Sequence, residues 1–409
     1  MTETTHSPEH AGQKMNTSSL IFFAAITLLY ISFGTVLGFV QGGLPPLLRA
    51  QGLDVETVGV AFFLYVPIGL AFLWAPLIDR YHTPLLRPRS GWIVVMQAVS
   101  LLGLVVLSTG ESWPLGLLFA VGLVVTVAVA TMDIALEALI VDSVNERQRA
   151  IAAACKISSF CVGAIFGGGV FVALTATIGW SGIFFCMVAL GAIALVAALL
   201  LGRFERHADT RPPALSLHAL VRRPNFLKKL GLTCSLFAAI VSLFALNRVA
   251  LIDLGMSLEA NGWIVGTVGP IVSIAGALLA AACTRMIGTK PVLYVSAAGA
   301  VVTGATWAIA AANMNLELGT IATLVGAGWL ASVYTVIYAA ILRWSVGPTS
   351  ATDYAILFSL GNLAGLVAAG IATQLIAHLG WPTFYSMATG LFILVVAIAR
   401  RDLLDEDSP

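Results

Sequence analysis

The segment SLIFFAAITLLYISFGTVLGFVQGG, residues 19–43, carries no charged side chain over a length that can cross a bilayer. A hydrocarbon core about 30 Å thick requires roughly 20 apolar residues per helix. Segments of this kind recur along the 409 residues, of which 59% are hydrophobic and only 10% charged, an apolar excess that a soluble domain could not shield from water. The sequence therefore predicts an all-α membrane protein with twelve transmembrane helices. The expected segments are approximately 19–43, 58–78, 91–109, 114–141, 150–176, 181–201, 231–252, 262–283, 291–311, 319–342, 353–376 and 382–399.

The basic residues indicate the orientation of these helices. With the N-terminus inside, 18 of the 21 Lys and Arg residues fall on the inner side, whereas Arg49 and Arg248 fall on the outer side and Lys156 lies within a helix. Basic residues accumulate on the cytoplasmic side of membrane proteins. We therefore expect both termini in the cytoplasm. The inner residues are Lys14, Arg80, Arg87, Arg89, Arg147, Arg149, Arg203, Arg206, Arg211, Arg222, Arg223, Lys228, Lys229, Arg285, Lys290, Arg343, Arg400 and Arg401.

The longest hydrophilic interruption separates the sixth and seventh helices and divides the chain into halves. The halves echo one another at an offset of a little over 200 residues: Asp79-Arg80 follows the second helix, and Thr284-Arg285 follows the eighth. Two six-helix bundles with a substrate site between them are typical of secondary transporters. The expected units are a cytoplasmic tail (1–18), an N-terminal bundle (19–201), a cytoplasmic central loop (202–230), a C-terminal bundle (231–399) and a cytoplasmic tail (400–409).

Motifs for catalysis and metal binding are missing from the sequence. It contains no GxSxG, no HExxH and no nucleotide-binding loop, and its six histidines lie in expected tails and loops. The five cysteines lie in apolar segments without metal-ligand spacing, so we expect packing roles for them. The sequence thus predicts a protein that is not an enzyme and has no cofactor or metal site.

Several motifs resemble one family of transporters. They are LAFLWAPLIDRY (70–81) with SGW (90–92), MDIALEALIVDSVNERQRA (132–150), SATDYAILFSL (350–360) and GWPTFY (380–385). The chain resembles the major facilitator superfamily across both halves, and in particular its branch of muropeptide permeases and rhizobactin- or pyochelin-type siderophore importers. The compact twelve-helix form favours the siderophore importers, because muropeptide permeases tend to be longer. Those permeases also tend to carry an acid early in the seventh helix, where residues 229–233 (KLGLT) have none.

The resemblance implies a multi-pass transporter of the bacterial inner membrane. We expect proton-coupled uptake of a siderophore or ferric siderophore from periplasm to cytoplasm. The alternatives are an anhydromuropeptide permease, an efflux transporter of the same fold, and a sensor or scaffold with a degenerate transporter fold. The expected partners are a small-molecule substrate, the proton and the lipid bilayer, with no nucleic acid, and the chain is expected to be a monomer.

Three charged residues lie well inside two neighbouring expected helices, the fourth and the fifth. Asp133 and Glu137 are one turn apart on the fourth helix, and Lys156 lies on the fifth. Antiparallel neighbours place Glu137 and Lys156 at similar depth, which predicts an ion pair that neutralises both. Asp133 is deeper and has no obvious basic partner, so we expect it, with Glu137 as the next candidate, to carry a coupled proton. The alternative for Asp133 is a protonated acid that hydrogen-bonds to its neighbours.

A second group of charges lies at the cytoplasmic helix ends: Asp79, Arg80, Asp142, Arg147 and Arg149. The resemblance implies that they form a network that closes the cytoplasmic side in one state of the transport cycle. The alternative is that the basic residues only set the topology.

Candidate substrate contacts are the last group. Arg248, with Asn247 beside it, could be a counter-ion for an anionic substrate, or an interfacial Arg whose head reaches water. Helices one, four, seven and ten line the cavity in the superfamily, which implies roles for Tyr30, Trp329 and Tyr334. The alternative for these aromatic side chains is packing or lipid contact.

Overall fold

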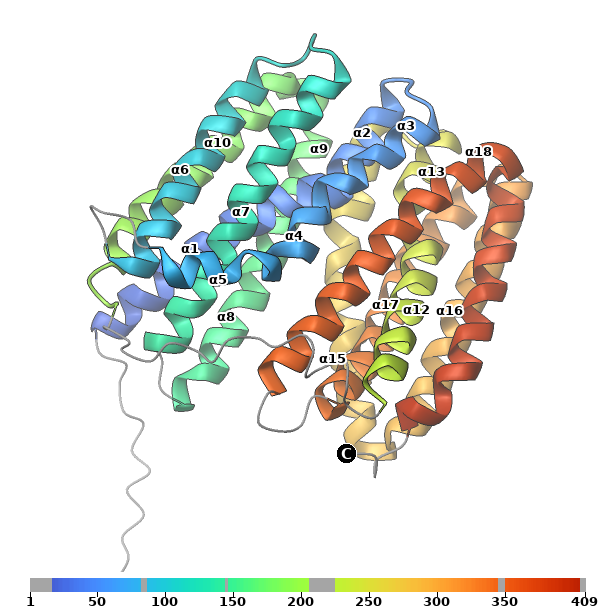
Figure 1. Cartoon of the computed structure of the whole chain (residues 1–409). Helices are drawn as coiled ribbons and strands as arrows, with labels where there is room; N and C mark the ends of the chain where they lie inside the picture. The colour runs from blue at the N-terminus through green and yellow to red at the C-terminus, as the bar shows by residue number, and fades with distance from the viewer. Residues whose placement is uncertain (1–16, 82–86, 144–145, 206–224, 345–349, 405–409) are drawn as a thin grey trace, which may run out of the picture.

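The computed structural model describes residues 17–81, 87–143, 146–205, 225–344 and 350–404 (Figure 1). The first half of the chain forms α1 (Thr17–Gly38), η1 (Phe39–Gly43), α2 (Leu44–Ala50), α3 (Val55–Val60), η2 (Ala61–Tyr65), α4 (Val66–Leu70), η3 (Ala71–Leu73), α5 (Ala75–Arg80), α6 (Pro88–Ser108), α7 (Leu115–Ser143), α8 (Glu146–Ile165), η4 (Phe166–Val170), α9 (Phe171–Ala173) and α10 (Thr175–Leu201). The second half forms α12 (Phe226–Phe244), α13 (Asn247–Asp253), α14 (Leu258–Ala260), η5 (Asn261–Val268), α15 (Gly269–Ile287), α16 (Thr289–Ala312), α17 (Leu316–Trp344) and α18 (Ser350–Leu404).

The twelve expected segments all correspond to runs of these helices. Ten helical runs in the described part of the chain are long and apolar enough to cross a membrane. The last run, Ile356–Leu404, contains a kink at Gly380 and therefore supplies two crossings. The second expected crossing is divided among α3, η2, α4, η3 and α5, because Pro67 and Pro76 cannot continue the hydrogen-bond ladder and begin new helical turns. The all-α, twelve-segment prediction is confirmed.

A repeated corner relates the two halves. Gly179-Trp180 and Gly380-Trp381 both occur where one crossing ends and the next begins, and both glycines have positive φ, of 68° and 75°. Residues with a Cβ rarely adopt this conformation, so glycine permits the sharp reversal. Each Trp then donates an indole hydrogen bond to a neighbouring helix, Trp180 to the Leu107 carbonyl and Trp381 to the Asp253 carboxylate, both at 2.8 Å.

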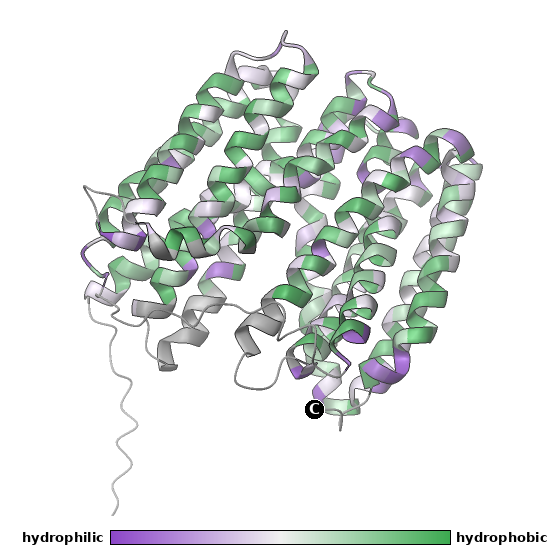
Figure 2. Cartoon of the chain, viewed as in Figure 1, coloured by the Kyte–Doolittle hydropathy of each residue, from purple (hydrophilic) through white to green (hydrophobic). Residues whose placement is uncertain are grey.

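The helices of each half pack mainly against one another. In the first half α1 packs on α8 and α10, and α6 packs on α7 and α10; in the second, α12 packs on α18, and α17 on α15 and α16. Large apolar side chains such as Leu102, Leu278 and Ile309 are more than half exposed. Figure 2 shows hydrophobic residues along the length of the helices and many of the hydrophilic ones near helix ends. This pattern suits helices whose outer faces contact lipid.

The two halves meet chiefly near one end of the molecule, where α2, α3 and α13 lie at the top of Figure 1. We call these contacts the seam: η4 against η5, α2 against α13, and α3 against α18. A Cβ on Gly266 would lie 2.4 Å from the Gly168 carbonyl oxygen, and one on Gly59 would lie 2.1 Å from the Thr373 hydroxyl. At Gly266, glycine therefore permits a close approach of two backbones, and at Gly59 it leaves room for the Thr373 side chain.

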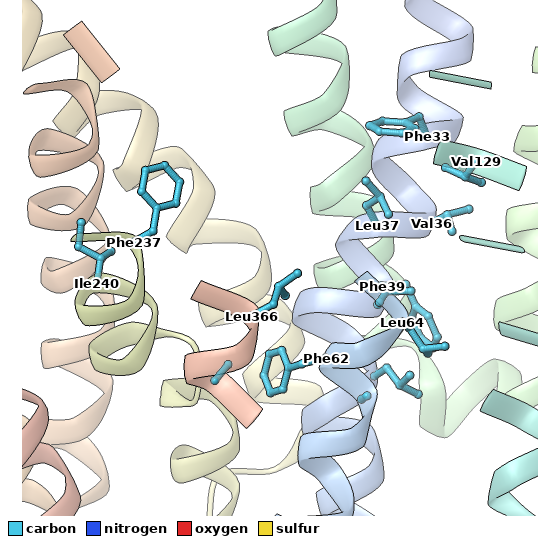
Figure 3. Close-up of a cluster of buried hydrophobic side chains, with 14 of the residues drawn as sticks. Phe33, Val36, Leu37, Phe39, Phe62, Leu64, Val129, Phe237, Ile240 and Leu366 are labelled. Atoms are coloured by element: carbon cyan, nitrogen blue, oxygen red, sulfur yellow. The ribbon is translucent and has the colours of Figure 1, made fainter. Parts of the chain in front are cut away.

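Side chains also close the seam. Figure 3 shows Phe62 of η2 and Leu366 of α18 side by side, and both are buried. Arg49 of α2 forms an ion pair with Asp253 of α13, and Trp381 donates to the second oxygen of the same carboxylate. Apolar packing and a bridging ion pair thus act together at this end.

A buried carboxylate joins two helices at the other end of the first half. Glu205, which follows α10, accepts hydrogen bonds from the backbone amides of Arg89 and Ser90 at 2.7 and 3.0 Å and from the Ser90 hydroxyl at 2.8 Å. These amides belong to the first turn of α6, where a carboxylate is favoured by the helix dipole and by unsatisfied N–H groups. Glu205 therefore anchors the end of α10 to the start of α6.

Candidate functional site

Four polar side chains gather halfway along the helices of the first half. Lys156 of α8 forms an ion pair with Glu137 of α7, and its Nζ lies 3.4 Å from the Asp133 carboxylate. The Tyr30 hydroxyl of α1 donates to Glu137 at 3.1 Å. The Lys156 ammonium also lies 5.1 Å from the centre of the Tyr30 ring, within the range of a cation–π interaction. We call Tyr30, Asp133, Glu137 and Lys156 the charged cluster.

The structure corrects one expectation about this cluster. Asp133 was expected to lack a basic partner, and this is wrong. Asp133 and Glu137 lie one turn apart on the same face of α7, so one long, flexible side chain on the antiparallel neighbour can reach both. Lys156 thus bridges two carboxylates instead of pairing with Glu137 alone.

The charge and exposure of the cluster bear on its chemistry. Two carboxylates and one ammonium leave a formal charge of −1, which one proton would neutralise. The side chains keep 23% (Asp133), 44% (Glu137) and 35% (Lys156) of their surface accessible. Ionisable groups at this depth that remain accessible are typical of substrate or proton pathways in membrane proteins.

Tyr65 connects this cluster to the second half of the chain. It lies within electrostatic range of Asp133 and Lys156, and also of Tyr334 of α17. Tyr334 packs edge-on against Phe237 of α12, with ring centres 5.3 Å apart. Tyr65 therefore lies near both the charged cluster and an aromatic pair of the second half.

Arg248 lies in the seam itself. Its Nε donates to the Asn261 side-chain oxygen at 2.8 Å, and Asn261 donates back to the Arg248 carbonyl at 2.9 Å. Within the described part of the chain Arg248 forms no ion pair. The nearby Asp253 is engaged by Arg49 and Trp381.

Two other candidate substrate contacts have packing roles. Asn247 is buried, and its amide hydrogen-bonds to the Tyr385 hydroxyl at 2.9 Å. The Trp329 ring lies directly over Gly299 of α16, where a Cβ would come within 2.2 Å of the indole. Both side chains make contacts within the C-terminal helices, and their role in substrate binding stays a prediction.

The expected cytoplasmic charge network lies outside the side chains that the structure describes. Its members are Asp79, Arg80, Asp142, Arg147 and Arg149. Their grouping stays a prediction.

The sequence interpretation missed the Arg49–Asp253–Trp381 group. The available signal was Arg49 itself, one of only two basic residues expected on the outer side. The sequence alone could not identify the partner of Arg49, because Asp253 lies 204 positions away in the other half of the chain.

An apolar pocket lies away from these polar groups. It is lined by α1, η1, α2, η2, α6, α7 and α10, with Phe39, Leu104, Phe119 and Trp180 among its walls. Its lining contains almost no polar surface, so it offers no contact for a polar solute.

The comparisons with known proteins agree with this architecture. Residues 22–313 match the Major Facilitator Superfamily, and the chain belongs to that family. It is accordingly a multi-pass membrane protein and a secondary transporter of this class.

The chain is also similar to individual proteins of known name or structure. The chain is 24% identical to the anhydromuropeptide permease of Escherichia coli (strain K12) over 407 residues, covering 93% of this chain and 80% of the permease. Its fold is similar to crystal structures of a mutant nucleoside transporter NupG (TM-score 0.71, 14% identity, 93% of this chain and 99% of that chain) and of a D-xylose-proton symporter (TM-score 0.69, 12% identity, 96% and 98%). At these identities the structural likeness shows the fold alone.

Removal of Lys156 should destabilise the protein. Lys156→Gln leaves two carboxylates together at membrane depth, so we expect a lower midpoint of thermal unfolding in detergent. The loss in free energy of unfolding should stay below the roughly 3–5 kcal/mol seen when a fully buried ion pair is broken, because these side chains are partly exposed. Lys228→Gln is the matched control, because Lys228 pairs with Asp402 at an exposed position.

The double variant Glu137→Gln with Lys156→Gln should recover part of that loss, since it removes one carboxylate together with the ammonium. Additive damage in the double variant would contradict a stabilising role for the pair.

Proposed function

We propose that this chain is a proton-coupled importer of anhydromuropeptide-type solutes in the bacterial inner membrane. The similarity to the E. coli permease spans 93% of the chain and supports this substrate class. The siderophore interpretation favoured by the sequence therefore gives way to its stated alternative, because the similarity over nearly the whole chain is to a muropeptide permease.

The charged cluster is the observation that carries the proposal. Its formal charge of −1 leaves a place for one proton, and its partial exposure gives that proton a route to the cluster. Asp133 is the better carrier, because Glu137 is already engaged by both Lys156 and Tyr30. The interaction of Lys156 with each of the two acids would then change in strength as Asp133 gains or loses the proton.

The arrangement of the halves supports alternating access. In this proposal both termini lie in the cytoplasm, so the seam faces the periplasm and its contacts close that side. In this proposal the N-terminal (19–201) and C-terminal (231–399) bundles move as units about the solute. Parting of the seam would admit the solute, and its closure would commit the solute to the cytoplasm.

Uptake into liposomes tests this function. The purified protein should accumulate labelled anhydromuropeptide when the outside is more acidic, and a protonophore should abolish accumulation. Accumulation of ferric rhizobactin or ferric pyochelin in place of the anhydromuropeptide would overturn the substrate assignment. Accumulation that a protonophore leaves unchanged would overturn the coupling, and transport that is driven only outward would favour efflux.

A further inference from the structure

Three π-helical segments converge on one side chain. The described residues contain η1 on the first crossing, η4 on the fifth and η5 on the eighth, and they contact one another at the seam. Gly42 belongs to η1, Gly168 to η4 and Asn261 to η5, and all three residues surround the guanidinium of Arg248. π-helical turns inside α-helices recur at functional sites. Their convergence therefore marks Arg248 as more than a packing residue.

The guanidinium is hydrogen-bonded on one side and faces glycine residues on another. Asn261, which is fully buried, accepts from Nε at 2.8 Å and is within 3.5 Å of Nη2 through its backbone oxygen. Nη1 faces the two glycines: a Cβ at position 42 would lie 2.8 Å from it, and one at position 168 would lie 3.5 Å from it. Because positions 42 and 168 carry no side chains, none fills this edge, and Nη1 donates no hydrogen bond within the described structure.

The charge of Arg248 is not matched by an acid. Two other cations of the described helices, Arg49 and Lys156, each form an ion pair with a carboxylate. By contrast, every hydrogen bond that the Arg248 side chain makes in the described structure goes to Asn261, which is neutral. A cation at membrane depth normally acquires a counter-charge. An oriented guanidinium with a free edge is suited to a planar carboxylate, and its single charge matches one carboxylate better than a dianionic phosphate.

We propose that Arg248 binds a carboxylate of the transported solute when the seam is parted, so that the substrate must carry an acidic group at the end that first enters the seam. This inference rests on the proposed import function and adds the anionic character of its substrate. In the closed seam, η1 and η4 cover the site, so closure would require the carboxylate to leave Arg248 and move toward the cytoplasmic side. Arg248 is then a contact for initial binding and not for the released state.

Binding to the purified full-length protein in detergent, measured by calorimetry, tests this proposal. The two probes are an anhydromuropeptide with free carboxylates and the same molecule with its carboxylates converted to amides. The wild type should bind the carboxylate probe at least about tenfold more tightly than the amide, since loss of a charge-assisted contact costs that much or more. Arg248→Gln should remove this difference by weakening only the carboxylate probe, and Arg248→Lys should retain part of it.

A second variant keeps the charge of Arg248 but blocks the approach to its guanidinium. Gly42→Ala places a methyl group against Nη1, so it should also lower the preference for the carboxylate. Gly231→Ala is its matched control, because a Cβ there meets nothing within 4 Å. Equal binding of both probes by the wild type, or equal weakening of both by Arg248→Gln, would overturn the Arg248 proposal alone. Failure of the wild type to bind either probe would overturn the proposed substrate class and this inference with it.

Discussion

Asp133→Asn is expected to abolish uphill accumulation of substrate while exchange of substrate across the membrane continues. Asparagine keeps the size of the side chain and a hydrogen-bond acceptor for Lys156, which lies 3.4 Å from the acid. It cannot take up and release a proton. Glu137, the one remaining carboxylate, is held by both Lys156 and Tyr30, so in this proposal it does not carry the coupled proton. The variant should therefore resemble a permanently protonated transporter.

The size of this effect follows from the driving force. One proton that enters down about 100 mV releases about 2.3 kcal/mol, which supports about 50-fold accumulation of a neutral solute. The accumulation of an anionic solute is smaller, because its own charge opposes the potential. Asp133→Asn should reduce the accumulation ratio in liposomes to one, with labelled substrate still exchanging against unlabelled substrate.

Glu137→Gln separates the two acids. If Asp133 carries the proton, Glu137→Gln should retain accumulation, although with lower stability, because Asp133 can still titrate against Lys156. Wild-type accumulation by Asp133→Asn under a proton gradient would refute the assignment and make Glu137 the next candidate.

The second large effect is expected from Gly266→Ala, which should keep the seam from closing. The added methyl would lie 2.4 Å from the Gly168 carbonyl oxygen and 2.6 Å from the Gly169 Cα. Both contacts are with backbone, which cannot rotate away as a side chain can. The closed seam is therefore destabilised, while a state with the seam parted makes no such contact, so the population shifts toward the parted state.

Labelling of a single cysteine measures this shift. Leu366→Cys, in a background where the five native cysteines are replaced by serine, places a thiol at a position that is buried in the closed seam. A membrane-impermeant thiol reagent should label it faster in Gly266→Ala, and transport should fall by about tenfold, the effect of roughly 1.4 kcal/mol. Gly231→Ala, in α12, is the control, because a Cβ there meets nothing within 4 Å. Unchanged labelling in Gly266→Ala would show that the seam tolerates the methyl.

The features that depend on one helix at a time could be predicted from the order of the amino acids. Each crossing was visible because a segment must be apolar over the thickness of the bilayer, whatever its neighbours are. The repeated Gly-Trp corners and the divided second crossing also have local causes, in positive φ at glycine and in the missing N–H of proline. The similar depth of Glu137 and Lys156 followed from the short connection between two antiparallel helices.

Which side chains meet depends instead on how the helices pack. In lipid, apolar length does not set how a helix is rotated; close packing with its neighbours does. For this reason the sequence could not show that Lys156 also reaches Asp133, that Trp329 lies over Gly299, or that Arg49 pairs with Asp253 from the other half. The setting of Arg248 is the strongest case, since its neighbours come from three crossings far apart in the chain and only glycine backbones let them approach.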